Sequence, residues 1–211
     1  MSDLLIILVV LTNLRLMATG RIHVMITWVA IQGAVMGAFA LHSRWSHLSL
    51  DVLIIGIVAL ILKGYVFPKL LYRVTKVFHS GRESEPYAGY ITSMLIGAGA
   101  LAVSIWLGKR LPIPGNDTSQ LLVPATLFSI FCGQFLIVER KLAISQVVGF
   151  LVMENAAFMI GVGTLYYAPF LVEIGVLLDM LVAVLLLSVL INDINRVFHH
   201  IDTHLLTRLR G

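Results

Sequence analysis

Long runs of apolar residues follow one another along the whole chain and limit the possible folds more than any other feature. Each long run approaches the roughly 20 residues that an α-helix needs to cross a hydrocarbon core of about 30 Å. The composition agrees, because 59% of the residues are hydrophobic and 12% are charged, against about 25% charged in a typical soluble domain. We therefore predict an all-α integral membrane protein with too little polar sequence for a sizeable soluble domain.

The runs predict about seven transmembrane helices. These cover residues 4–18, 23–41, 50–68, 88–107, 121–138, 140–165 and 170–191. We expect the third span to end at Phe67 and Pro68 and to be followed by a basic connector that reaches Pro86. Between the fourth and fifth spans, a loop rich in Pro, Gly and Asn interrupts the helical pattern.

The basic residues predict the orientation of the spans. With the N-terminus outside, eleven Lys and Arg residues lie on the cytoplasmic side and three lie outside, whereas Lys63 falls within the third span. Cytoplasmic loops carry such an excess, so we expect an external N-terminus and a cytoplasmic C-terminus. The net charge of +4 follows from this placement, and we expect no binding to nucleic acid. No basic n-region precedes the first span, so we expect no removable signal peptide.

Residues 194–211 have an amphipathic pattern that predicts a further helix on the cytoplasmic surface. Apolar residues recur on one face of this helix, and the other face is polar and basic. Such a helix lies in the membrane interface or, alternatively, docks a partner subunit. His200 and His204 lie four residues apart but lack the glutamate of a zinc motif, so we predict no metal site there.

Two carboxylic acids lie near the middle of the last two spans, Glu154 in 140–165 and Asp179 in 170–191. An ionisable side chain near the bilayer centre costs roughly 2.5–3.5 kcal/mol even on lenient insertion scales, so its presence favours a functional role. The short break between the spans makes the two helices antiparallel neighbours, and both acids can lie at a similar depth. We interpret them as proton-handling groups; in the alternative interpretation they are protonated, hydrogen-bonded and only hold the helices together.

Two further charged residues lie inside spans. Lys63 is either a cation that reaches toward the cytoplasmic surface or a counter-charge for one of the acids or for a partner subunit. Glu173 lies nearer the outer edge of its span, where the pattern is compatible with a structural or a functional role. Our candidate proton-transfer residues are therefore Glu154, Asp179, Lys63 and Glu173, and we predict no catalytic residue in the chain.

One cysteine, Cys132, lies inside an apolar run, and no cluster of Cys and His residues offers ligands for zinc or an iron–sulfur centre. We therefore expect no cofactor and no metal in this chain. Any redox chemistry would belong to partner subunits.

The segments VVGFLVMENAAF and APFLVEIGVLLDMLVAV resemble the membrane-subunit family called hydrogenase-4 component E. The MEN triplet, the segment from Pro169 to Gly175 and the Asp four residues after that Gly carry the resemblance, which is densest from Arg140 to Asp193. The resemblance implies a non-redox subunit in the membrane arm of a group 4 nickel–iron hydrogenase, such as formate hydrogenlyase. These complexes are related to respiratory complex I.

Residues 121–193 further resemble the three-helix K-type subunit of complex I and the C-type subunit of multisubunit cation/proton antiporters. The chain thus divides into four N-terminal transmembrane helices (1–120), this three-helix unit and the amphipathic tail (194–211). Asp179 stands where the complex I subunit has one glutamate. The other family glutamate corresponds to Leu151, whereas the acid here is Glu154, about one turn later. Whether a continuous proton path survives this displacement is left open.

The leading hypothesis is a multi-pass subunit of a hydrogenase complex in a prokaryotic inner membrane. It contributes buried carboxylates to proton translocation, while nickel–iron and iron–sulfur centres lie on partner subunits. The resemblance implies antiporter-like and core membrane subunits, the iron–sulfur peripheral arm and membrane lipids as partners. The alternatives are a subunit of a cation/proton antiporter or of another complex I-like complex, and a passive membrane scaffold.

Overall fold

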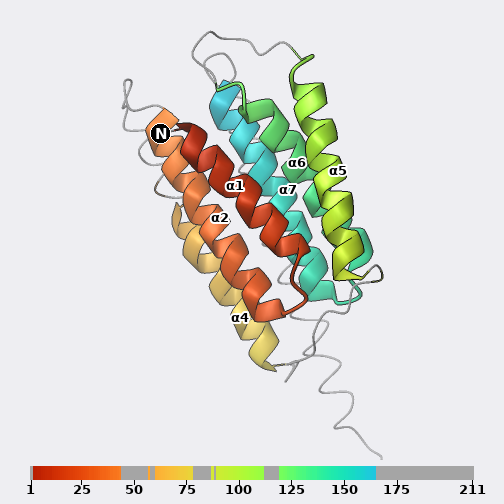
Figure 1. Cartoon of the computed structure of the whole chain (residues 1–211). Coiled ribbons are helices and arrows are strands. Elements are labelled where there is room, and N and C mark those ends of the chain that lie inside the picture. The colour runs from red at the N-terminus through yellow and green to blue at the C-terminus, as the bar shows by residue number, and fades with distance from the viewer. Residues whose placement is uncertain are drawn as a thin grey trace, which may run out of the picture.

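The computed structural model describes residues 2–43, 57, 60–77, 87, 89–111 and 119–164 (Figure 1). In this part of the chain the regular elements are all helices. They are α1 (Ser2–Met17), α2 (Ile22–Ser43), the π-helical turn η2 (Leu62–Val66), α4 (Phe67–Val77), α5 (Tyr90–Gly108), α6 (Leu122–Glu139) and α7 (Ala143–Thr164). The predicted all-α fold is confirmed for these residues, and the helix ends agree with the predicted spans to within a few residues except in the third span.

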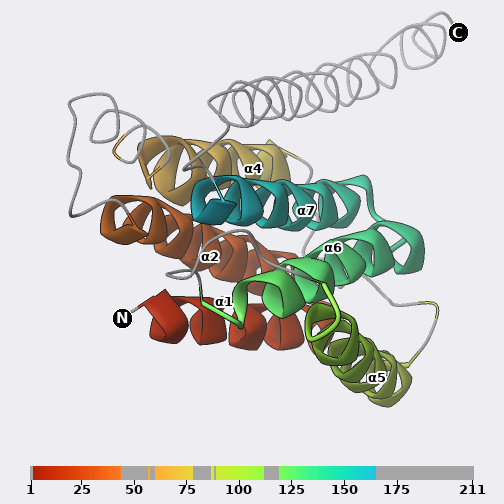
Figure 2. The same cartoon turned by 90° about the horizontal axis from the view of Figure 1, so that it is seen from above.

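The helices form a bundle in which α1 and α2, and likewise α6 and α7, run in opposite directions (Figure 1). Seen from above, α1, α2, α6 and α7 lie together, and α4 and α5 lie at opposite margins of the bundle (Figure 2). The contact between α6 and α7 is the most extensive in the described residues, and α2 packs against both α1 and α7. Because α7 has α2 on one side and α6 on the other, its middle residues are enclosed.

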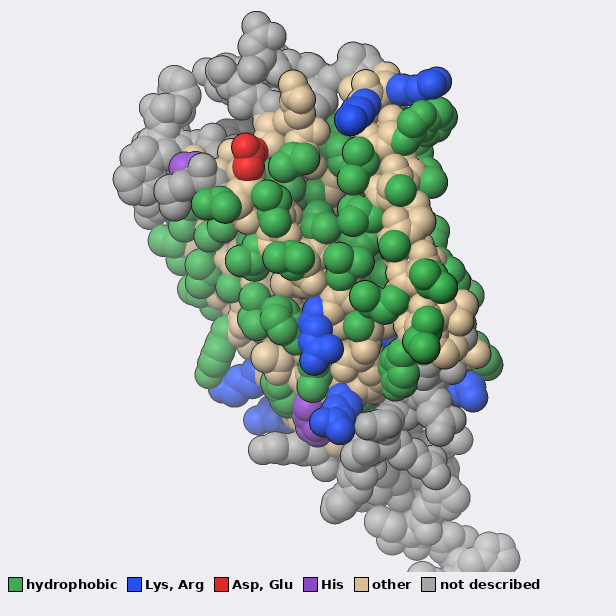
Figure 3. All heavy atoms as spheres, in the orientation of Figure 1, with side chains coloured by type: hydrophobic (Ala, Val, Ile, Leu, Met, Phe, Trp, Pro, Cys, Tyr) green, Lys and Arg blue, Asp and Glu red, His purple; other side chains and the backbone are tan. Residues whose placement is uncertain are grey.

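Four of these helices, α2, α5, α6 and α7, are long and apolar enough to cross a membrane. Apolar side chains cover the middle of the face shown in Figure 3, and Lys and Arg side chains lie mainly toward its two ends. These features support an α-helical membrane protein. The predicted seventh span, 170–191, and the predicted amphipathic tail, 194–211, lie outside the described residues, so the number of seven spans and their orientation stay predictions.

The helix does not stop at Pro68, where the third span is predicted to end, but continues through this residue as α4. Proline usually breaks a helix, since its ring clashes with the carbonyl group four residues earlier and it donates no hydrogen bond. Here a π-helical turn precedes it, in which the Phe67 N–H bonds to the Leu62 carbonyl oxygen, five residues back. The wider turn accommodates the ring. Further along α4, Leu71 and Thr75 are buried against the bundle, which stabilises a segment predicted to be a connector.

Two glycines hold α6 and α7 in direct backbone contact. A Cβ atom at Gly133 would lie 2.6 Å from the Gly149 carbonyl oxygen, and a Cβ at Gly149 would lie 2.7 Å from the Gly133 oxygen. Both distances are shorter than real Cβ contacts, so any side chain here would push the two helices apart. Small residues permit such close approach between membrane helices. The contact fixes the middle of α7 against α6 just before Glu154.

Candidate functional site

Glu154 lies half-way along α7 and is buried, with 2% of its surface exposed. Its neighbours on the same face of the helix, one turn to either side, are Leu151 and Phe158. The side chain therefore leaves the helix within an apolar interior. This position agrees with the prediction that the acid lies near the middle of its span.

Lys63 forms a buried ion pair with Glu154. Lys63 is 4% exposed and belongs to the π-helical turn η2, and its Nζ donates a hydrogen bond to Glu154 Oε1. The same ammonium group lies 4.3 Å from the ring centroid of Phe158, in cation–π contact. The interpretation of Lys63 as a counter-charge for an acid is confirmed, and the alternative in which it reaches toward the membrane surface is wrong.

An ion pair in this position is costly both to bury and to break. Burial removes water from the two charges at several kcal/mol per ion, and removal of one partner costs roughly 3–5 kcal/mol because the other charge is left uncompensated. The protonation states of the two groups are therefore coupled. A proton that neutralises Glu154 takes away the counter-charge of the Lys63 ammonium group, and loss of the ammonium proton does the same to the carboxylate.

A row of hydrogen-bonded polar side chains begins at Asn155, the residue after Glu154, and crosses the bundle. Asn155 Nδ2 donates to Gln32 Oε1 at 3.2 Å, and Gln32 Nε2 donates to Asn13 Oδ1 at 2.8 Å. Asn13 Nδ2 then donates to Ser129 Oγ at 2.7 Å, and this hydroxyl donates to the Ala125 carbonyl oxygen at 2.7 Å. The row links α7, α2, α1 and α6 in turn, so four helices meet at the site through polar contacts.

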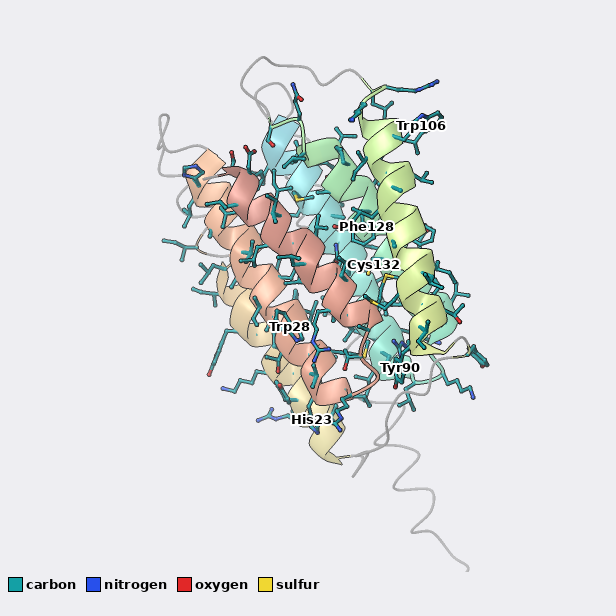
Figure 4. All side chains as sticks on the ribbon, in the orientation of Figure 1. His23, Trp28, Tyr90, Trp106, Phe128 and Cys132 are labelled. Atoms are coloured by element: carbon teal, nitrogen blue, oxygen red, sulfur yellow. The ribbon has the colours of Figure 1, made fainter. Side chains whose placement is uncertain are left out.

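The row is sealed from solvent by apolar neighbours. Asn13, Gln32 and Ser129 are each 0% exposed. Phe128 and Cys132 of α6, labelled in Figure 4, are also 0% exposed, and Cys132 Sγ lies 3.5 Å from the Asn13 carbonyl oxygen. Buried polar groups must be hydrogen-bonded, since an unsatisfied one costs about 1–3 kcal/mol. The match of donors to acceptors along the row therefore specifies how these four helices pack.

Sequence analysis did not identify this row of hydrogen-bonded side chains. The one sequence feature that could have indicated it is that its members are polar residues inside apolar runs. In the sequence, Asn13 and Ser129 look like single polar residues that an apolar helix can accommodate, because their hydrogen-bond partners lie in other helices. The 116 positions that separate the two give no local pattern to read.

A second buried ionic cluster, also missed, lies at the turn between α6 and α7. Arg140 is 1% exposed and Glu139 is 5% exposed, although the sequence places Arg140 at the membrane edge. Arg140 Nη2 donates to the Met17 carbonyl oxygen at 3.3 Å. Its Nε lies 3.9 Å from Glu139 Oε2, and Ser93 Oγ donates to Glu139 Oε1 at 2.5 Å. This cluster is about 21 Å from Glu154 along the helix, at 1.5 Å per residue, and so forms a separate feature.

Asp179 and Glu173, the other predicted proton-transfer residues, lie outside the described residues. The predicted approach of Asp179 to Glu154 therefore stays a prediction. Among the residues that the structure describes, no three His, Cys, Asp or Glu side chains group as they would to hold a metal ion. The described residues thus provide a buried ion pair and a row of hydrogen-bonded polar side chains.

Comparison with known proteins gives distant relatives. The chain is 28% identical over 206 residues to the uncharacterized protein Rv0085 of Mycobacterium tuberculosis, covering 95% of this chain and 92% of the relative. It is 23% identical over 153 residues to hydrogenase-4 component E of Escherichia coli, covering 72% of this chain and 71% of the relative. The protein of the same name from Shigella flexneri matches equally well. No family model and no solved structure matches the chain.

The fold and the site define a helical membrane protein with an ion pair buried among its helices. The distant similarity to hydrogenase-4 component E suggests this family and agrees with the resemblance noted in the sequence. It fits a membrane subunit of a larger complex.

Proposed function

We propose that this chain is a non-redox subunit in the membrane arm of a hydrogenase complex related to complex I, and that it handles protons that the complex translocates. The observation that carries the proposal is the buried Lys63–Glu154 pair. A separate row of hydrogen-bonded polar side chains, which begins at the residue after Glu154, crosses four helices of the same bundle. Ionisable residues inside membrane spans are expensive and typically mark ion or proton pathways. The similarity to hydrogenase-4 component E supports the assignment to this kind of complex.

In the proposed mechanism, protonation of Glu154 and displacement of charge at Lys63 occur as one coupled step. A proton that reaches the carboxylate leaves an uncompensated ammonium group in a medium of low dielectric constant, which is strongly unfavourable. The site returns to neutrality when Lys63 gives up its proton or when the proton leaves Glu154 for another acceptor. Asp179, predicted to lie at similar depth on the next span, is the proposed acceptor.

Electron transfer belongs to other subunits in this proposal. The whole sequence contains one cysteine, so it cannot supply the sets of cysteine ligands that nickel–iron and iron–sulfur centres require. The proposed partners are the antiporter-like and core membrane subunits, the iron–sulfur arm and membrane lipids. Conformational or electrostatic coupling to the redox subunits would then drive the change of protonation at Glu154.

The test compares proton pumping with hydrogen production in inverted membrane vesicles that hold the assembled complex. The variant Lys63→Met/Glu154→Leu removes both charges without leaving one of them unpaired. We expect hydrogen production to continue and the proton gradient per hydrogen formed to fall at least severalfold. Asp3→Asn, which removes an exposed acid from α1, is the matched control and should leave both rates unchanged.

The same experiment distinguishes the alternatives. Unchanged pumping in the double variant would mean that the chain is a passive scaffold with respect to protons. Affinity purification of the full chain from its native membrane, followed by identification of the co-purifying proteins, tests the kind of complex. A partner with nickel-binding cysteines is expected for a hydrogenase, and a set of partners without one would favour an antiporter.

A further inference from the structure

Gly33 of α2 lies directly against the backbone of Lys63. A Cβ atom at Gly33 would lie 2.6 Å from the Lys63 carbonyl oxygen, 2.7 Å from its carbonyl carbon and 2.8 Å from its Cβ. All three distances are below the range that real Cβ atoms show, and two of the three atoms belong to the backbone. The neighbour cannot move aside by changing a rotamer, so an alanine at this position requires the turn that carries Lys63 to shift.

A second glycine extends this contact by one helical turn. A Cβ at Gly37 would lie 2.7 Å from the Leu60 Cβ and 2.9 Å from its Cα. Gly33 and Gly37 thus form a strip without side chains on α2, and the backbone from Leu60 to Lys63 lies on it. Two other glycines provide contrast. A Cβ at Gly64 would make an ordinary contact of 3.5 Å, and a Cβ at Gly99 would meet nothing within 4 Å.

The strip on α2 positions both sides of the ion pair. Gln32, the residue before Gly33, accepts a hydrogen bond from Asn155, which is the residue after Glu154. One turn of α2 therefore holds the acid-bearing part of α7 through Gln32 and the lysine-bearing turn η2 through Gly33. A shift of η2 away from α2 would move Lys63 while Glu154 stays in place.

We propose that Gly33 is a positioning residue of the proton-handling site, because its missing side chain lets η2 lie on α2 and so brings Lys63 Nζ to Glu154. This inference rests on the proposed function for its significance, but its geometric content can be tested separately. The sensitive quantity is the proton affinity of Glu154, which depends on the distance to the ammonium group. A residue that only helped the helices to pack would not alter it.

The experiment is infrared difference spectroscopy of the full chain as a function of pH. The carboxyl band of Glu154 is assigned by its loss in Glu154→Gln. In Gly33→Ala we expect the pH midpoint of this band to shift by about one unit or more, a tenfold change in proton affinity. Gly64→Ala and Gly99→Ala are the matched controls, each adding the same methyl group without a clash, and their midpoints should agree with the parent.

An unchanged midpoint in folded Gly33→Ala would overturn the proposal. If this variant yields too little folded protein, Gly37→Ala makes a similar displacement one turn away from Lys63. The pH midpoint of the Glu154 band is then measured in Gly37→Ala, and an unchanged midpoint there would overturn the proposal. Proton pumping in vesicles, measured on the same variants, separates the two proposals. A shifted midpoint with unchanged pumping would uphold the role of Gly33 in positioning Lys63 and would refute the proposed function of the pair.

Discussion

Replacing Lys63 or Glu154 alone should destabilise the chain far more than replacing both. Their side chains are 2% and 1% exposed, so solvent screens neither charge. Glu154→Leu leaves a buried ammonium group and Lys63→Met leaves a buried carboxylate, and either change should cost about 3–5 kcal/mol. The double variant fills the space with apolar side chains, and we expect its free energy of unfolding to be within about 1 kcal/mol of the parent value or above it.

Cys132 provides the measurement, because it is the one cysteine of the chain and is 0% exposed. A thiol reagent reaches it only after the surrounding helices separate, so its rate of modification reports the opening equilibrium of the purified full chain in detergent micelles. At about 1.4 kcal/mol per tenfold change, each single variant should be modified between about a hundredfold and several thousandfold faster than the parent. Asp3→Asn should be modified at the parent rate.

The double-mutant cycle decides whether the two charges act as a pair. If they do, the double variant is modified far more slowly than the product of the single effects predicts. A double variant in which the single effects simply multiply would refute the reasoning. So would single variants that each accelerate modification less than about fivefold.

Two further predictions use the same thiol-protection measurement. Arg140→Met removes the cation beside the buried Glu139 carboxylate, and we expect a loss of about 3 kcal/mol at neutral pH, whereas an unchanged modification rate would mean that the cluster contributes nothing to stability. Gly149→Ala places a methyl group against the backbone of Gly133 and should cost about 1–3 kcal/mol by overpacking. Gly99→Ala, on the open side of α5, is its control and should have no measurable effect.

The sequence predicts most of the helices, because each is a long apolar run and a bilayer demands that such runs be helical. The continuation of the helix beyond Pro68 was not predictable in this way. Whether a helix stops at Pro68 depends on the turn before it, and a π-helical turn has no signature in the order of apolar residues. The basic segment beyond Pro68 was predicted to be a connector, whereas in the structure Leu71 and Thr75 are buried against the bundle.

The candidate site was predictable in its parts and not in its assembly. Glu154 and Lys63 are conspicuous in the sequence, since ionisable residues are rare within spans. Their pairing joins residues 91 positions apart, and the sequence left Lys63 with three possible roles. For Arg140 the sequence indicates a membrane edge, as a basic residue at the end of an apolar run normally does, but it does not indicate that the side chain is buried in the bundle. Its acceptor, the Met17 carbonyl oxygen, lies 123 positions away.

The hydrogen bonds between the polar side chains from Asn155 to Ser129 all point in the same direction, from α7 toward α6. The Gln32 and Asn13 amides each donate toward α6 and accept from the side of α7, so their dipoles lie head to tail. Turning over the Gln32 amide alone would oppose donor to donor and acceptor to acceptor at both of its bonds. If Asn155, Asn13 and the Ser129 hydroxyl turned as well, the three bonds between side chains would re-form with the opposite polarity, but Ser129 would lose its bond to the Ala125 carbonyl oxygen, which can only accept. The bond from Ser129 to the Ala125 carbonyl oxygen therefore favours one direction for the whole row of hydrogen bonds, which ties the orientation of the Asn155 amide on α7 to that of a hydroxyl group on α6.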